Sequence, residues 1–183
     1  HLNILQPRML SGHLQGRLLS AFSKALNPSK ILEIGTYTGY SALCLAEGLV
    51  PGGNLYTIDI NKELELFAKS YFDLSKYNKM INMIIGNACE LLPKMNHSWD
   101  LVFIDADKEN YSNYFDLVID QVKSGGWIIA DNVLWSGKVT KPTIKNDTET
   151  AAIKAFNTKV KSDSRVTNLL LPIRDGMMIL IKN

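Results

Sequence analysis

The stretch KILEIGTYTGYSALCLAEGL, residues 30–49, decides the fold class. Its first part, residues 30–35, is a continuous apolar run that ends in glycine, which is typical of a buried parallel strand. Helical spacing of apolar residues then returns from Tyr40 to Gly48. A buried strand, a glycine turn and a helix in this order indicate the start of an open α/β fold.

The same alternation continues on both sides of this stretch. Helical spacing predicts helices over residues 13–26, 62–77 and 111–123. Apolar runs between them predict strands over residues 54–60, 81–86, 99–107 and 125–131. Strands that alternate with helices form right-handed βαβ units, so we expect five parallel strands in one sheet.

The last third of the chain breaks this rhythm. Residues 134–147 read as a polar, basic loop, and Asp147 is placed to cap a helix over residues 148–161. Apolar runs at 166–173 and 176–182 flank Arg174 and Asp175, which predicts an antiparallel hairpin. A closing hairpin differs from the plain dinucleotide-binding pattern.

Bulk composition limits the class of protein. A chain of 183 residues with 46% apolar and 21% charged residues is the size and composition of one globular domain, so we expect a single domain over residues 1–183. The net charge of +2 does not by itself indicate nucleic acid or membrane binding. No apolar run has the length of a membrane span, and no signal peptide is visible. Cys44 and Cys89 lack metal-site spacing and read as buried thiols of a reduced, cytoplasmic compartment.

Ligands of open α/β sheets bind beyond the carboxyl ends of the strands. Gly35 and Gly39 follow the first strand and let the backbone approach a ligand closely. Asp59 ends the second strand at the spacing of an acid that binds ribose hydroxyls, and Ala88 follows the third. Each feature alone also fits an ordinary turn or loop acid. Together they favour a nucleoside site, without the glycine pattern of a diphosphate cradle.

The next two strand ends carry oxygen ligands. Asp105 follows the fourth strand, while Asp131 and Asn132 follow the fifth. Carboxylate and amide oxygens without His or Cys suit Mg²⁺, Mn²⁺ or Ca²⁺. The competing interpretation is a capped turn beside a solvated acid. Lys108 could then act as a base near the cation, and Trp135 could hold a flat substrate or simply pack in the core.

Two segments carry a family resemblance, LEIGTYTGYSALCLAEGL and IDADKENYSNYFDLVIDQVKSGGWIIADNVLW. With the closing hairpin they resemble the cation-dependent O-methyltransferases, which include plant caffeoyl-CoA and animal catechol enzymes. The motif DADKxNY followed by DN(x)₂W is highly specific, and PRMLSGHLQG resembles the bacterial members. The resemblance implies a Rossmann-like, seven-stranded methyltransferase fold that binds S-adenosylmethionine and a divalent cation.

The resemblance also implies a role for each matching residue. The cofactor contacts it implies are Met9, Ser11, Glu33, Gly35, Thr36, Tyr37, Ser41, Asp59, Ala88 and Asp105. The implied metal ligands are Asp105, Asp131 and Asn132, the implied base is Lys108, and the implied substrate contacts are Asp107 and Trp135. Ser136 stands where the plant enzymes have an Asn that touches substrate, which argues against a coenzyme A ester. The family also has a helical segment before Met9, so we expect that an N-terminal segment is missing here.

We therefore expect a homodimeric O-methyltransferase acting on a small molecule with vicinal oxygens. Some bacterial members modify a wobble uridine in tRNA, and Lys138, Lys141 and Lys145 would suit its phosphates. A non-catalytic nucleoside-binding module and a nicotinamide-dependent dehydrogenase are the remaining alternatives. A binding module would need a damaged catalytic site, yet all four expected residues are present: Asp105, Lys108, Asp131 and Asn132. The missing motif glycine and the closing hairpin argue against the dehydrogenase.

Overall fold

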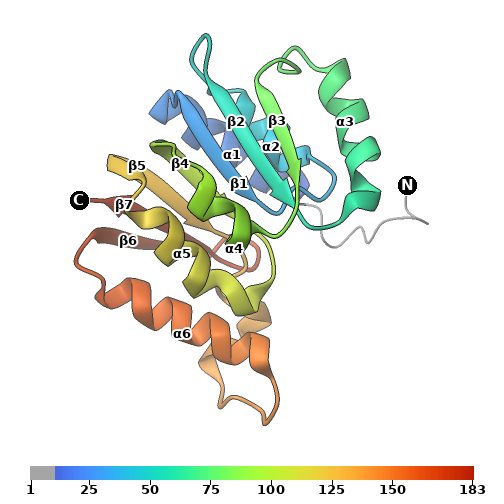
Figure 1. Ribbon diagram of the computed structural model, residues 1–183. Coiled ribbons are helices and arrows are strands. Elements are labelled where there is room, and N and C mark those ends of the chain that lie inside the picture. Colours follow the sequence, from blue (N-terminus) through green and yellow to red (C-terminus); the bar gives the residue numbers. More distant parts are fainter. Residues whose placement is uncertain (1–10) are drawn as a thin grey trace.

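The structure is a computed structural model that describes residues 11–183. Seven strands form one sheet in the order β3-β2-β1-β4-β5-β7-β6 (Figure 1). The strands are β1 (Lys30–Ile34), β2 (Asn54–Asp59), β3 (Ile81–Ile85), β4 (Trp99–Ile104), β5 (Val122–Ala130), β6 (Val166–Leu171) and β7 (Met177–Lys182).

The first five strands are parallel, as expected. β1 pairs with both β2 and β4, and the chain leaves this centre first toward β3 and then toward β5. β7 is antiparallel to both β5 and β6, which confirms the closing hairpin. The expected seven-stranded α/β methyltransferase fold is therefore confirmed. The order of the strands reverses between β1 and β4, which is where such sheets bind ligands.

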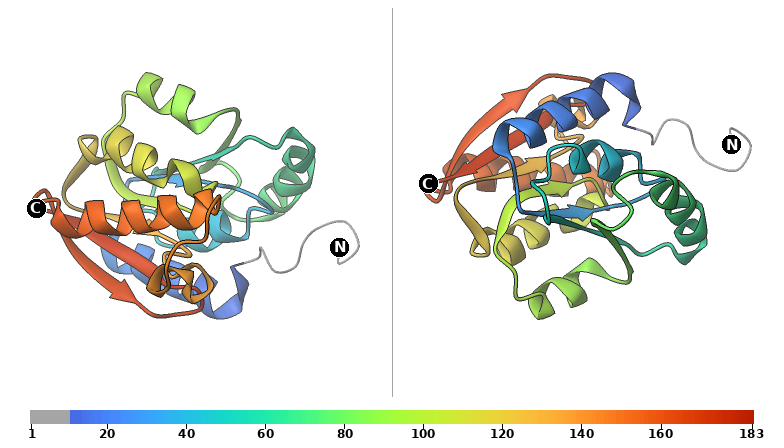
Figure 2. Two further views of the ribbon diagram at one scale, coloured as in Figure 1. Left: turned by 90° about the horizontal axis from the view of Figure 1, so that it is seen from below. Right: turned by 90° about the horizontal axis from the view of Figure 1, so that it is seen from above.

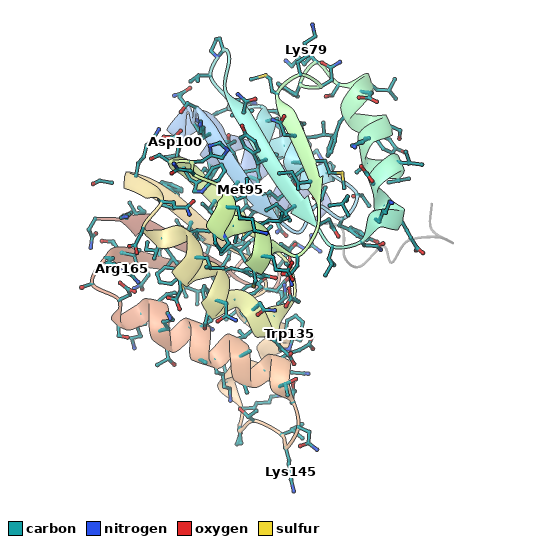
Figure 3. The ribbon with its side chains drawn as sticks, viewed as in Figure 1. Lys79, Met95, Asp100, Trp135, Lys145 and Arg165 are labelled. Atoms are coloured by element: carbon teal, nitrogen blue, oxygen red, sulfur yellow. The ribbon has the colours of Figure 1, made fainter. Side chains whose placement is uncertain are left out.

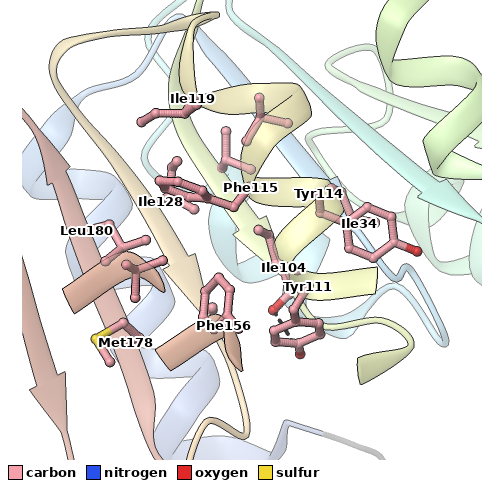
Figure 4. Close-up of a cluster of buried hydrophobic side chains, with 14 of the residues drawn as sticks. Ile34, Ile104, Tyr111, Tyr114, Phe115, Ile119, Ile128, Phe156, Met178 and Leu180 are labelled. Atoms are coloured by element: carbon pink, nitrogen blue, oxygen red, sulfur yellow. Dashed lines mark hydrogen bonds between the residues drawn. The ribbon is translucent and has the colours of Figure 1, made fainter. Parts of the chain in front are cut away.

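Helices cover both faces of the sheet (Figures 1 and 2). One face packs against α1 (Gly12–Leu26), α2 (Tyr40–Ala46) and α3 (Glu65–Leu74), whose buried residues include Leu19, Leu45 and Phe72. The other face packs against α4 (Ala88–Leu91), α5 (Tyr111–Ile119) and α6 (Thr148–Ser162). Figure 4 shows the core on this second face, where Tyr111, Phe115 and Phe156 pack together.

Several boundaries differ from the predictions. The helix expected over 111–123 ends at Ile119, and β5 begins at Val122 instead of at Gly125. Gly125 and Gly126 lie inside β5, at a register irregularity opposite the start of β4, so they mark a distortion within the strand and not its start. The helix expected over 62–77 is a 3₁₀ turn, η2 (Lys62–Leu64), followed by α3, which ends at Leu74.

Short helices account for the remaining differences. We did not predict α4 or the 3₁₀ helices η3 (Leu92–Lys94) and η4 (Lys108–Asn110). The expected loop 134–147 contains the 3₁₀ stretch η5 (Trp135–Thr140). The cap was predicted correctly, because Asp147 accepts a hydrogen bond from the backbone amide of Thr150 at 3.1 Å.

Two further expectations concern the cysteines and the membrane. Cys44 is a buried free thiol as expected, whereas Cys89 is a free thiol that is only half-buried. None of the helices within residues 11–183 has the length and apolar character needed to cross a membrane.

Candidate active site

A pocket of about 1090 Å³ opens at the carboxyl ends of the parallel strands. It lies over the reversal of strand order between β1 and β4. Most residues implied by the resemblance line it: Ser11, Gly35, Thr36, Tyr37, Ser41, Asp59, Ala88, Asp105, Asp107, Lys108, Asp131, Asn132 and Trp135. Glu33 is absent from this lining, and Met9 lies outside the described residues.

The glycine turn after β1 depends on the absence of side chains. Gly35 has a φ of +102°, and a Cβ there would lie 2.0 Å from the backbone oxygen of Asp105. Gly39 has a φ of +81°, and its Cβ would lie 2.5 Å from the ring of Phe72. Both positions therefore require glycine for conformation and for space. The turn brings the end of β1 directly against the end of β4.

Asp59 braces this turn from the neighbouring strand. Its Oδ2 accepts a hydrogen bond from the backbone amide of Tyr37 at 2.7 Å, and its Oδ1 accepts one from Asn61 at 2.8 Å. Asp59 also lines the pocket. Asp59 therefore braces the loop, as one interpretation of the sequence predicts, and its position in the pocket lining is compatible with the other interpretation, contact with a ligand.

Glu33 is fully buried behind the glycine turn. Its Oε2 accepts a hydrogen bond from the hydroxyl of Thr57 at 2.5 Å, whereas Oε1 has no hydrogen-bond partner within residues 11–183. Burial raises the pKa of Glu33 to about 8, and the hydroxyls of Ser41 and Thr57 act against this rise. A buried carboxyl group with one unsatisfied oxygen is suited to a cationic group brought by a ligand.

The acidic end of the pocket lies where β4 and β5 stop. Asp131 is only 3% exposed, and its Oδ1 accepts a hydrogen bond from the backbone amide of Asn132 at 2.8 Å. Burial and the nearby charge of Asp105 raise the pKa of Asp131. Asn132 has a φ of +58°, a conformation that asparagine tolerates better than most residues.

The donor set fits a hard cation. It consists of two carboxylates and one amide, all of which line the same pocket. In the described part of the chain no group of three or more His, Cys, Asp and Glu side chains is arranged to hold a metal. Binding would therefore depend on the mixed Asp105, Asp131 and Asn132 set, whose oxygens suit Mg²⁺, Mn²⁺ or Ca²⁺ better than zinc.

Lys108 lies beside this set and is only 7% exposed. Its Nζ is 3.1 Å from Oδ1 of Asp105 and donates to the hydroxyl of Tyr111 at 2.6 Å. The ammonium group also lies over two rings, 4.7 Å from the ring centroid of Tyr111 and 5.7 Å from that of Trp135. Figure 3 shows the position of Trp135. A buried lysine held at the pocket wall is placed to exchange a proton with a ligand.

The two substrate contacts implied by the resemblance both line the pocket. Asp107 is exposed, and its carboxylate accepts hydrogen bonds from Tyr114 and Asn110. Trp135 is partly buried, packs against the core and has no hydrogen-bond partner for its indole nitrogen within the described residues. Trp135 therefore both lines the pocket and packs against the hydrophobic core.

Sequence reasoning missed several residues near the site, and four of them make informative contacts or extend the pocket wall. Glu149 and Arg174 line the pocket from α6 and from the turn between β6 and β7. Gln15 and Tyr111 bond to Asp131 from opposite faces of the sheet. Tyr111 was within reach because it is the last letter of the quoted DADKxNY motif, but no pattern in the sequence pairs Gln15 with Asp131.

The comparisons with known proteins agree with this geometry. The model of the family described as O-methyltransferase matches residues 2–183. The chain belongs to this O-methyltransferase family. The caffeoyl-CoA O-methyltransferase of Medicago sativa is 35% identical to this O-methyltransferase over 176 residues, which cover 90% of the chain and 71% of the relative.

Solved structures give the same result. The O-methyltransferase TomG from Streptomyces achromogenes, solved in complex with SAM, superposes with a TM-score of 0.91 at 27% identity, covering 97% of this O-methyltransferase and 83% of TomG. The O-methyltransferase from Bacillus cereus, in complex with SAH, has a TM-score of 0.89 at 29% identity, covering 96% and 84%. This O-methyltransferase is therefore an S-adenosylmethionine-dependent enzyme, and it is similar to caffeoyl-CoA O-methyltransferases.

Proposed function

We propose that this enzyme transfers a methyl group from S-adenosylmethionine to one hydroxyl of a small acceptor with vicinal oxygens, such as a catechol, with the help of a divalent cation. The observation that carries the proposal is the buried Lys108 beside the oxygen set of Asp105, Asp131 and Asn132 in a single pocket. An acid-rich site with one buried amine suits deprotonation of a hydroxyl and attack on a methyl group.

The half of the pocket at β1 and β2 would hold the methyl donor. Asp59 would accept hydrogen bonds from the ribose hydroxyls, and the small side chain of Ala88 would leave room for the adenine. The unsatisfied oxygen of Glu33, behind the glycine turn, would accept a hydrogen bond from the ammonium group of the methionine tail. Ser11, which directly precedes α1 and lines the pocket, would contact the tail, and the resemblance implies the same role for Met9.

The half of the pocket at β4 and β5 would hold the cation and the acceptor. Asp105, Asp131 and Asn132 would be the protein ligands, which we expect to take Mg²⁺ and also Mn²⁺ or Ca²⁺. When bound, the cation lowers the pKa of a coordinated hydroxyl and orients the acceptor. Lys108, after releasing the proton that pairs it with Asp105, would take the hydroxyl proton on Nζ as a free amine, and Trp135 and Asp107 would hold the acceptor ring and its substituents.

The tRNA alternative has less support. Lys138 forms an ion pair with Asp147 at 3.1 Å, and Lys145 lies at the tip of the loop below α6 (Figure 3). The curated relative described above is named for a small-molecule ester. We therefore propose a small-molecule acceptor, and we keep the homodimer as a prediction for light scattering on the purified protein.

One assay tests the proposed function. Purified enzyme receives methyl-labelled S-adenosylmethionine with a panel of catechols, matched monophenols and tRNA, each with and without a chelator. We expect labelled catechols, little labelling of monophenols, loss of transfer on chelation and recovery with Mg²⁺ or Mn²⁺. Full transfer to a catechol after exhaustive chelation would contradict the cation role, and labelling of tRNA alone would contradict the acceptor class.

A further inference from the structure

The side chain of Gln15 on α1 contacts Asp131, which directly follows β5 at the carboxyl ends of the parallel strands. Its Nε2 donates a hydrogen bond to Oδ2 of Asp131 at 2.5 Å. Gln15 is 1% exposed and Asp131 is 3% exposed, so water competes little with this bond. The two residues are 116 positions apart in the chain, and α1 otherwise packs mainly against α2.

This contact completes the support of the Asp131 carboxylate. The backbone amide of Asn132 occupies one lone pair of Oδ1, and Gln15 occupies one lone pair of Oδ2. A carboxylate oxygen has two lone-pair sites, so each oxygen keeps one for a further partner. The carboxylate plane is therefore fixed from two sides while the carboxylate still has free capacity toward the pocket.

An amide is well suited to this position. Its NH₂ group donates a hydrogen bond without adding charge, so it orients the carboxylate of Asp131 and leaves the negative charge in place. A lysine or arginine at this position would neutralise that charge. A buried carboxylate that lacked this donor would have an oxygen with an unsatisfied hydrogen-bonding site, which is unfavourable. The rotamer of Gln15 is in turn constrained by burial on α1.

We propose that Gln15 is a positioning residue that holds Asp131 in the orientation that binds the divalent cation. The inference rests on the proposed function, because it concerns the cation assigned there. Residues that hydrogen-bond to a metal ligand from behind commonly change metal affinity ten- to a hundredfold when they are removed, which is about the scale we expect here. Gln15 itself does not line the pocket and so has no direct contact with substrate.

The test measures metal binding directly, without catalysis. Mn²⁺ is titrated into the full chain by calorimetry and followed by its electron paramagnetic resonance signal. Gln15→Met keeps the length and volume of the side chain but removes the donor, and Gln15→Asn keeps the amide but shortens it by one methylene. For both variants we expect Mn²⁺ affinity to fall about ten- to a hundredfold. The affinity for S-adenosylhomocysteine without metal should change less than about twofold, since most of its proposed contacts lie at the ends of β1, β2 and β3.

Ser23→Ala provides the matched control for stability. Ser23 is also buried on α1, and its hydroxyl donates to the backbone oxygen of Leu45 at 2.6 Å, away from the pocket. We expect this variant to lose a similar amount of thermal stability while its Mn²⁺ affinity stays unchanged. If Gln15→Met does not fold, Gln15→Asn decides the question with the same readouts.

The outcomes separate the two levels of the proposal. Reduced Mn²⁺ affinity in the Gln15 variants with retained affinity in Ser23→Ala supports the positioning role. Wild-type affinity in the Gln15 variants overturns it and leaves the proposed function intact. Absence of Mn²⁺ binding in the unmodified enzyme overturns the cation assignment and the positioning role together.

Discussion

The ammonium nitrogen of Lys108 lies 2.6 Å from the hydroxyl oxygen of Tyr111, and that hydroxyl donates to the backbone oxygen of Asp131 at 3.0 Å. Tyr111 is fully buried, and burial with the surrounding carboxylates raises its pKa well above the ordinary value. The phenol therefore stays neutral. It connects the proposed base on η4 to the backbone of the proposed metal ligand after β5.

Replacing Tyr111 by Phe should slow methyl transfer without weakening donor binding. The change removes one hydrogen bond to a charged group, so we expect turnover to fall about tenfold or more. Lys108→Ala, which removes the base itself, should slow turnover by about 10²–10⁴-fold. Turnover is measured at saturating donor across a range of pH, because a changed environment of Lys108 should move the pH profile. Tyr56→Phe, outside the pocket lining, is the control, and an unaltered Tyr111→Phe profile would refute the connection.

Replacing Asp59 by Ala should weaken donor binding. The variant loses the proposed acceptor for two ribose hydroxyls and also the brace on the backbone of Tyr37. Hydrogen bonds to charged groups contribute about 1.5–3 kcal/mol, so affinity for S-adenosylhomocysteine should fall at least about tenfold by calorimetry. Asp73→Ala on the exposed side of α3 removes a carboxylate elsewhere and should bind normally. Equal affinities in the two variants would exclude a ribose role for Asp59.

Glu33 should make the stability of the free enzyme depend on pH. Its pKa is about 8 in the folded chain against 4.5 as the ordinary value, so the folded state holds the proton more tightly. The contribution of protonated Glu33 to the free energy of unfolding is then fully present below pH 4.5, and it is lost as the pH rises toward and through 8. Glu33→Gln should remove this loss and be more stable than the unmodified enzyme at pH 8, by at least about 1 kcal/mol. Urea unfolding at pH 5 and pH 8, without donor, checks this, and parallel curves for both proteins would disprove it.

Replacing Asp131 by Ala should separate catalysis from donor binding. The proposed cation would lose one of two carboxylate ligands, so methyl transfer should be abolished while affinity for S-adenosylhomocysteine stays largely intact. Chelation of the unmodified enzyme should reproduce this phenotype, and added Mg²⁺ or Mn²⁺ should reverse only the chelation. Retained transfer in Asp131→Ala would remove this residue from the site.

Much of the fold could be predicted because local pattern and global topology agree. The central parallel strands β1 and β4 are buried on both faces and read as continuous apolar runs. The carboxyl ends of the parallel strands carry the polar residues that meet in the pocket. Boundaries were harder where local signals compete. The glycine pair at 125 and 126 suggests that the strand starts there. In the structure Val122 already pairs with Trp99, so pairing with β4 makes β5 begin three residues earlier than the glycine pair suggests.

The supporting contacts of the site could not be predicted for a different reason. Asp131 and Lys108 belong to motifs near strand ends, whereas Gln15 lies on a helix whose amphipathic pattern only indicates that one face is buried. Periodicity places Gln15 toward the sheet but does not identify which strand end it meets. The partner depends on how α1 is placed over the sheet, which is a property of packing in three dimensions.

The bond between Gln15 and Asp131 also has a consequence for how the enzyme folds. It closes a loop of 116 residues, and such distant contacts form late because the chain must first lose the entropy of that loop. The turn at Gly35 and its brace at Asp59 involve much shorter separations. A refolding chain should therefore regain helical signal and donor binding before it regains Mn²⁺ binding. Recovery of Mn²⁺ binding is thus a stricter measure of complete refolding than recovery of the helical signal.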